Sequence, residues 1–295
     1  MAAASIPVDL SNPGQVFACL GFLETAHILI GDAKGGFDWT REDDVRFRLA
    51  ANGGANPIEC VLRFLDEATV TAVAPAGSTN NASKWKIDTV TDDSGSFPFG
   101  DPSRPDVFPA RLTDASGRSV TIDHWGDETH RRDRVKFWAG AGGYPGVALA
   151  RDVLDRIRGR AGDHSDAPFS LNAEQSSSFR FDWRRDYVPM DAGFSPNEHK
   201  STMVMQGYPV VELLATVGLT NARPRRHDRL HYSYGVAGVV GAELYDPMFL
   251  RASLGSRKPP FPGMPFRLFA MQLDWPGQEG QARCITNVNE ETLPS

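Results

Sequence analysis

The sequence is poor in cysteine and has no long uninterrupted apolar run. Its three cysteines, Cys19, Cys60 and Cys284, are odd in number and lack metal-ligand spacing, so neither a disulfide framework nor a zinc site is expected. The longest apolar run, residues 16–30, is interrupted by a glutamate, a threonine and a histidine and is too short for a membrane span. The first residues lack the basic and apolar regions of a secretory signal. We therefore expect a cytoplasmic protein with no membrane partner.

Signatures of common enzyme classes are also missing. The sequence contains no Gly-x-Ser-x-Gly elbow, no P-loop and no His-Glu-x-x-His motif. The best catalytic cluster consists of Asp123, His124, Asp127 and His130, which would suit a metal-dependent nuclease. Against this interpretation, strand geometry would point Asp123 and His124 to opposite faces. We expect no catalytic residue, no metal and no cofactor, and keep the nuclease as an alternative.

The chain has no overall excess of positive charge, since its 295 residues carry a formal net charge of −6. Bulk attraction to nucleic acid is therefore not expected. The charge is unevenly distributed, because residues 129–230 contain 16 Lys and Arg against 12 Asp and Glu, which leaves −10 for the rest. The basic residues of this middle third occur in short clusters mixed with acids. Such clusters are as typical of a salt-bridged surface as of a nucleic-acid face.

Local patterns predict a mixture of helices and strands. Asparagine followed by proline opens two apolar segments, which predicts helices over about 13–30 and 57–67 with Asn12 and Asn56 as N-caps. Apolar periodicity predicts further helices over 147–157 and 208–219. Alternating or β-prone residues predict strands over 37–39, 45–49, 69–73, 111–113, 119–125, 135–138, 232–240 and 266–273. We expect one α+β unit of residues 1–295, with a mixed, mainly antiparallel sheet system, packed helices and a mobile insertion or binding loop at 75–109.

Residues 181–187 interleave arginines with aromatic rings. Arg184 and Arg185 follow Phe181 and Trp183 and precede Tyr187. Guanidinium groups bind phosphates, and flat rings can stack on bases. This segment therefore favours nucleic-acid binding over catalysis.

Several segments together resemble a known protein family. They are Asn12-Pro-Gly-Gln-Val-Phe-Ala-Cys-Leu-Gly-Phe-Leu-Glu24, Val120-Thr-Ile-Asp-His-Trp125, Lys136-Phe-Trp-Ala-Gly140, Met190-Asp-Ala-Gly-Phe-Ser-Pro-Asn197, residues 208–214 and Asn221-Ala-Arg-Pro224. In order and spacing they look like the Csb-type protein of type I-U (also called I-G) CRISPR systems, a small counterpart of the Cascade large subunit. The likeness runs from the first predicted helix to about residue 226.

The resemblance implies a non-enzymatic subunit of a crRNA-guided effector complex in antiviral defence. Such a subunit would contact the 5′ handle of the crRNA, take part in recognition of the PAM and the target double-stranded DNA, and recruit the Cas helicase-nuclease. Its other partners would be the backbone and Cas5/Cas6-type subunits. Because guide pairing reads the target sequence, such a protein needs only phosphate contacts and a few base contacts.

Candidate contacts come from the basic clusters and from amide side chains. The expected nucleic-acid-binding residues are Arg132, Arg134, Lys136, Arg184, Arg185, Lys200, Arg223, Arg225 and Arg226. The candidate base contacts are Asn12, Gln15 and Asn197, because amides can pair with adenine edges. Asn12 also fits a helix cap, and Asn197 fits the end of a turn. A purely structural assembly subunit, with an exposed face at residues 261–269, is the remaining alternative.

Overall fold

The structure is a computed structural model that describes residues 1–92, 94, 108–125, 145–174, 178–184, 206–275 and 283–292. Within these residues it contains five α-helices and thirteen β-strands. Three of the four sheets are antiparallel throughout, and the fourth contains one parallel pair. The predicted fold class, α+β with mixed and mainly antiparallel sheets, is confirmed.

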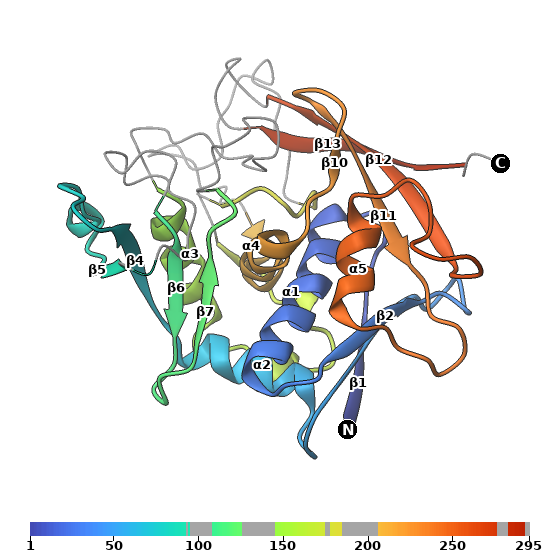
Figure 1. The fold of residues 1–295 in the computed structure, drawn as a ribbon, viewed down its shortest axis with the longest axis horizontal. Helices are drawn as coiled ribbons and strands as arrows, with labels where there is room; N and C mark the ends of the chain where they lie inside the picture. Colours follow the sequence, from blue (N-terminus) through green and yellow to red (C-terminus); the bar gives the residue numbers. More distant parts are fainter. Residues whose placement is uncertain are drawn as a thin grey trace.

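Two apolar helices cross at the centre of the molecule (Figure 1). Both α1 (Pro13–Leu29) and α4 (Pro209–Asn221) are buried on nearly all sides, as expected of helices that are apolar all round. Glycines allow their backbones to approach closely. A Cβ on Gly21 would lie 2.0 Å from a carbonyl oxygen of α4, and one on Gly218 would lie 2.1 Å from a carbonyl oxygen of α1. None of the described helices has the length and apolar character needed to cross a bilayer.

The predicted starts of the first two helices are confirmed. Asn12 Oδ1 accepts a hydrogen bond from the Gln15 N–H at 3.4 Å, and Asn56 Oδ1 accepts one from the Ile58 N–H at 2.9 Å. The second of these caps opens α2 (Pro57–Glu67). Gly31 follows the first helix with φ of +87°, a conformation that favours glycine.

Two connected sheets lie on one side of the central helices (Figure 1). The first has the order β1-β3-β2 and the second the order β10-β11-β12-β13. Their strands are β1 (Ala2–Pro7), β2 (Lys34–Asp38), β3 (Arg46–Ala51), β10 (Arg225–Arg226), β11 (His231–Ala237), β12 (Phe266–Asp274) and β13 (Cys284–Glu291). Bridges from Gly35 to Tyr245 and from Phe37 to Gly238 join the sheets, and α5 (Pro247–Leu254) packs against β11. The short strand β10 is therefore an edge strand reached directly from the end of α4.

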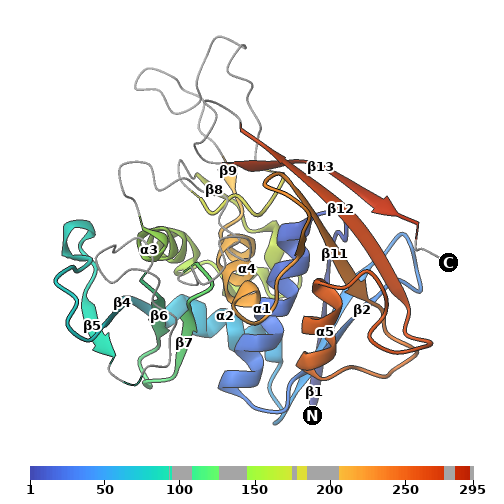
Figure 2. The ribbon, with the colours of Figure 1, turned by 45° about the horizontal axis from the view of Figure 1, so that its top comes forward.

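Another sheet lies on the opposite side of the central helices (Figures 1 and 2). It has the order β5-β4-β6-β7, in which β4 and β5 are parallel, and α3 (Gly146–Ile157) packs against β4 and β6. Its strands are β4 (Thr69–Pro75), β5 (Thr89–Asp92), β6 (Ala110–Thr113) and β7 (Ser119–Ile122). The strands β8 (Ala173–Glu174) and β9 (Gln206–Gly207) form a separate pair. The central helices are thus enclosed between sheets.

Several elements differ from the sequence prediction. One sheet system was expected, whereas the described residues form four sheets. The strand predicted over 119–125 ends at Ile122. The sequence did not predict β1 or β13, because these strands form through pairing with distant segments rather than through a strong local pattern. It did not predict α5 either, although Asp246 followed by Pro247 at the start of this helix repeats the cap-and-proline pattern of the first two helices. The strand predicted over 135–138 and residues 93 and 95–107 of the predicted loop lie outside the described residues.

Candidate nucleic-acid interface

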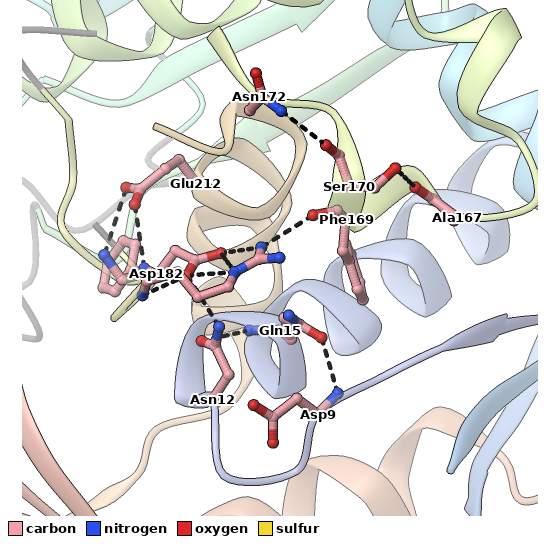
Figure 3. A network of polar contacts seen from close by, with 11 residues as sticks. Asp9, Asn12, Gln15, Ala167, Phe169, Ser170, Asn172, Asp182 and Glu212 are labelled. Carbon is pink, nitrogen blue, oxygen red and sulfur yellow. Dashed lines mark hydrogen bonds and ion pairs between the residues drawn. The ribbon is translucent and has the colours of Figure 1, made fainter. Parts of the chain in front are cut away.

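Asp182 lies at the centre of a buried polar network (Figure 3). Its Oδ1 accepts hydrogen bonds from Asn12 Nδ2 at 2.9 Å and from Arg184 Nε at 3.0 Å. Its backbone N–H donates to Glu212 Oε1 at 3.1 Å. Because Asn12, Asp182 and Glu212 are all buried, their polar groups need these partners. The network therefore fastens residues 178–184 to the first turns of α1 and α4.

The two amide side chains at the start of α1 face the protein interior. Asn12 is fully buried and Gln15 is 5% exposed. Gln15 Oε1 accepts a hydrogen bond from the Asp9 N–H at 2.8 Å, as Figure 3 shows. Asn12 and Gln15 therefore hold the start of the helix in place. This corrects the prediction that they contact bases, since buried amides present no edge to a ligand in this conformation.

Arg184 is also engaged within the protein. Besides its pairing with Asp182, its Nη2 donates to the Phe169 carbonyl oxygen at 2.9 Å, and its Cζ lies 3.5 Å from the Tyr208 ring centroid. Arg184 and Arg267 border a cavity of about 620 Å³ that is also lined by five acidic residues, Asp9, Glu42, Asp43, Asp44 and Glu290. Acidic residues therefore outnumber basic residues around this cavity. Negative potential in such a cavity disfavours phosphate. The structure therefore gives Arg184 a structural position, in contrast to the predicted phosphate contact.

An aromatic cluster surrounds the residues that follow β7. Trp125 stacks on Phe179 with 5.9 Å between ring centroids, and Phe179 stacks on Phe181 at 6.1 Å. The buried His124 ring lies 5.1 Å from Trp125. Phe181 is thus a core residue and is not exposed for stacking on bases. Two members of the alternative nuclease site, Asp127 and His130, lie outside the described residues, and the described part of the chain contains no metal-ligating group of three His, Cys, Asp or Glu.

A cluster of arginines forms at the connection from β10 to β11. Arg226 Nε donates to the Asp228 carbonyl oxygen at 2.9 Å, and Arg283, just before β13, donates to the Arg229 carbonyl oxygen. The Arg229 guanidinium Cζ lies 4.8 Å from the centroid of the Trp275 ring. We call Arg226, Arg229 and Arg283 the hairpin arginines. Strand pairing between β11, β12 and β13 brings Arg283 to the other two.

The hairpin arginines raise the local positive potential. Burial lowers the pKa of the Arg283 guanidinium, the Tyr232 hydroxyl opposes this effect, and the charges of Arg229 and Arg226 lower the pKa further. No described carboxylate forms an ion pair with Arg226 or Arg229. Such a group of like charges is suited to a polyanion.

Asp228 holds the shape of the loop that carries these arginines. Its carboxylate accepts hydrogen bonds from the Leu230 N–H at 2.8 Å and from the His231 N–H at 2.9 Å. The hydrogen bond from Leu230 is the main cause of its lowered pKa, and the His231 ring contributes as well. The carboxylate of this loop is thus directed at the backbone and the His231 ring.

The two other arginines predicted after α4 occupy different positions. Arg223 Nη1 donates to the Thr220 carbonyl oxygen at 3.3 Å, near the C-terminal end of α4, where a cation is favourable. Arg225 is exposed and, because side chains alternate along a strand, points to the face of β10 opposite Arg226. There it lines a hollow with residues 256–258. The predicted arginine run is thus divided among a helix end, a hollow and the hairpin.

The face expected at residues 261–269 is largely covered. Phe266 and Phe269 are buried. Phe261 packs edge-on against Tyr245 and Phe249, with ring centroids 5.8 Å and 5.5 Å away. These aromatic residues therefore contribute to packing within the chain rather than to an exposed apolar surface.

Some residues of the candidate interface have no signal in the local sequence, and several predicted contacts lie outside the described residues. Six predicted contacts lie outside the described residues: Arg132, Arg134, Lys136, Arg185, Asn197 and Lys200. Arg229 was not selected, although it belongs to the same arginine-rich run as Arg225 and Arg226. Arg283 and Trp275 have no sequence signal, because strand pairing alone brings them to the hairpin.

Two positively charged surfaces therefore flank the edge strand β10, one formed by the hairpin arginines and one by the hollow beside Arg225. Both are built from segments that are far apart in the sequence. Comparison of the chain with protein-family models, with curated proteins and with solved structures finds no match.

Proposed function

We propose that this chain is a non-catalytic subunit of a crRNA-guided CRISPR effector (Cascade) complex, resembling the Csb-type protein of type I-U systems. The observation that carries the proposal is the group of hairpin arginines on a chain with a net charge of −6. Such a distribution excludes general attraction to polyanions but supports attraction at one surface. A subunit that leaves sequence reading to a guide RNA needs only this limited contact.

The chemistry of the hairpin arginines favours contact with the nucleic-acid backbone. Guanidinium groups donate in a planar fork that matches phosphate oxygens. Trp275 packs against the Arg229 guanidinium and restricts its orientation. Phosphate contacts are independent of base sequence, so these residues would strengthen binding to any target.

The finer roles in the proposal follow from the family resemblance. They are participation in PAM and target recognition, contact with the 5′ handle of the crRNA, and recruitment of the helicase-nuclease. Neighbouring backbone and Cas5/Cas6-type subunits complete the set of partners. Arg132, Arg134, Lys136, Arg185 and Lys200 remain proposed contacts to nucleic acid, and Asn197 remains a proposed base contact.

The test compares target binding by the guide-loaded complex containing the wild-type chain or Arg226→Ala/Arg229→Ala. We expect about tenfold weaker binding, equal across a randomised PAM library, and a salt dependence reduced by about two phosphate contacts. Arg41→Ala/Arg63→Ala removes the same charge from exposed positions on another loop and on α2, and should leave binding unchanged. The measurement is the dissociation constant as a function of salt concentration.

Three results would contradict the proposal. Equal binding by the wild-type and arginine variants would show that the hairpin does not contact nucleic acid. Metal-dependent cleavage of the target by the purified chain would favour the nuclease alternative. A complex that fails to assemble without this chain, yet binds normally with the arginine variant, would indicate a purely structural subunit.

A further inference from the structure

The hollow beside Arg225 brings together three cationic side chains from two distant segments. It has a volume of about 480 Å³ and is lined by Arg225, Ser256, Arg257 and Lys258. Arg225 belongs to the edge strand β10, whereas the other three residues follow α5. No local pattern in the sequence groups these residues, since about thirty positions separate the two segments.

Close packing holds the two sides of this hollow together. A Cβ on Gly255 would lie 2.9 Å from the Arg223 carbonyl oxygen, so the loop after α5 lies directly against the segment that leads into β10. Ser256 shapes this loop, because its Oγ accepts a hydrogen bond from the Lys258 N–H at 3.1 Å and donates to the Lys258 carbonyl oxygen at 2.6 Å. The cationic side chains therefore project from backbone segments with fixed positions.

The charge in this hollow is largely uncompensated. The carboxylate of Glu291 lies 3.9 Å from Arg257 Nη2, and both side chains are partly exposed, so this ion pair is weak. Among the described residues, no carboxylate forms an ion pair with Arg225 or Lys258. Since no aromatic side chain lines the hollow, it offers cationic donors but no surface for stacking on a base.

We propose that this hollow binds a backbone phosphodiester group of a nucleic-acid strand. Arg225 and Arg257 would donate hydrogen bonds to the non-bridging oxygens, and Lys258 would act as a mobile point charge. The inference rests on the proposed function and extends it to a second surface. Because the hairpin arginines lie on the other face of β10, a bound strand crosses the edge of the sheet and contacts both surfaces.

The experiment measures fluorescence anisotropy of labelled single-stranded RNA and labelled double-stranded DNA of equal length, each titrated with the full-length chain. Arg257→Ala/Lys258→Ala is expected to weaken binding about tenfold and to reduce the salt slope by about one to two. Arg257→Lys/Lys258→Arg keeps both charges and should retain most of the affinity. Thermal unfolding of each variant verifies that the fold is intact, since both residues are exposed.

The outcomes separate this inference from the proposed function. If Arg257→Ala/Lys258→Ala weakens binding of RNA alone, the hollow contacts the guide. If it weakens binding of the DNA duplex alone, the hollow contacts the target. Weaker binding of both supports a shared phosphate site. If Arg257→Ala/Lys258→Ala binds unchanged while Arg226→Ala/Arg229→Ala binds more weakly, the proposal for the hollow is overturned and the proposal for the hairpin arginines stands. Three results would overturn both the proposal for the hollow and the proposal for the hairpin. They are unchanged binding by both variants, no binding by the wild-type chain at low salt, and competition by polyglutamate that is as effective as competition by unlabelled nucleic acid.

Discussion

Asp182 connects residues that are distant in the sequence. Its hydrogen bond to Asn12 spans 170 positions, and its side chain is only 1% exposed. Transfer of a carboxylate into the interior costs several kcal/mol unless partners compensate it. Arg184 and Asn12 supply that compensation here. At the scale of single residues, the position of Arg184 among aromatic residues is thus explained by its pairing with Asp182 inside the protein.

Asp182→Ala should lower the free energy of unfolding by about 3–5 kcal/mol, because it leaves the buried Asn12 amide without its acceptor and removes the carboxylate that pairs with Arg184. Urea denaturation measures this change. Asp43→Ala is the matched control, since the ion pair of Asp43 with Arg41 is exposed and should contribute less than about 1 kcal/mol. Equal destabilisation by the two variants would show that the buried network does not stabilise the fold.

At the scale of secondary-structure elements, the main contact of the fold is the close crossing of α1 and α4. The two helices share a contact at Gly21 and Gly218, where only hydrogen atoms separate one backbone from the other. A glycine in a helix interior costs about 1 kcal/mol relative to alanine. Here the close approach compensates for that cost by allowing the apolar faces of both helices to pack. Burial of both helices at this short distance therefore requires residues without side chains at the crossing.

Gly218→Ala should destabilise the protein by at least about 2 kcal/mol, although alanine is the better helix former. The added Cβ would lie 2.1 Å from the Phe17 carbonyl oxygen and would force the helices apart. Thermal or urea unfolding provides the measurement. A Cβ on Gly54 meets no atom within 4 Å, so Gly54→Ala should change stability by less than about 1 kcal/mol. An increase in stability for Gly218→Ala would contradict the close crossing.

At the scale of the whole molecule, the described part of the chain is held by one contiguous core. Buried apolar side chains from the central helices and from the sheets on both sides belong to the same cluster. Glu24 adds a polar connection, because its carboxylate accepts hydrogen bonds from Arg251 Nε at 2.6 Å and from Asn221 Nδ2 at 2.9 Å. These contacts join α1, α4 and α5. A continuous core of this kind favours a single cooperative unfolding transition.

Glu24→Gln should lower the free energy of unfolding by at least about 2 kcal/mol, because the buried carboxylate that pairs with Arg251 becomes neutral. The transition should remain single, since the mutation leaves the apolar core continuous. Calorimetry tests both statements, with Glu67→Gln on the exposed side of α2 as a control. Two separate transitions in the wild-type protein would contradict a shared core.

The sequence by itself determined the elements that depend on neighbouring residues. The caps at Asn12 and Asn56 and the periodicity of the apolar segments predict helix positions because capping and amphipathicity act within one or two turns. Tertiary structure decided which polar residues are exposed. It buried Asn12 and Gln15, engaged Arg184 within the chain, and brought Arg283 to Arg229 and residues 256–258 to Arg225. Burial and charge clustering depend on contacts between distant segments, and these contacts have no signature in the local sequence.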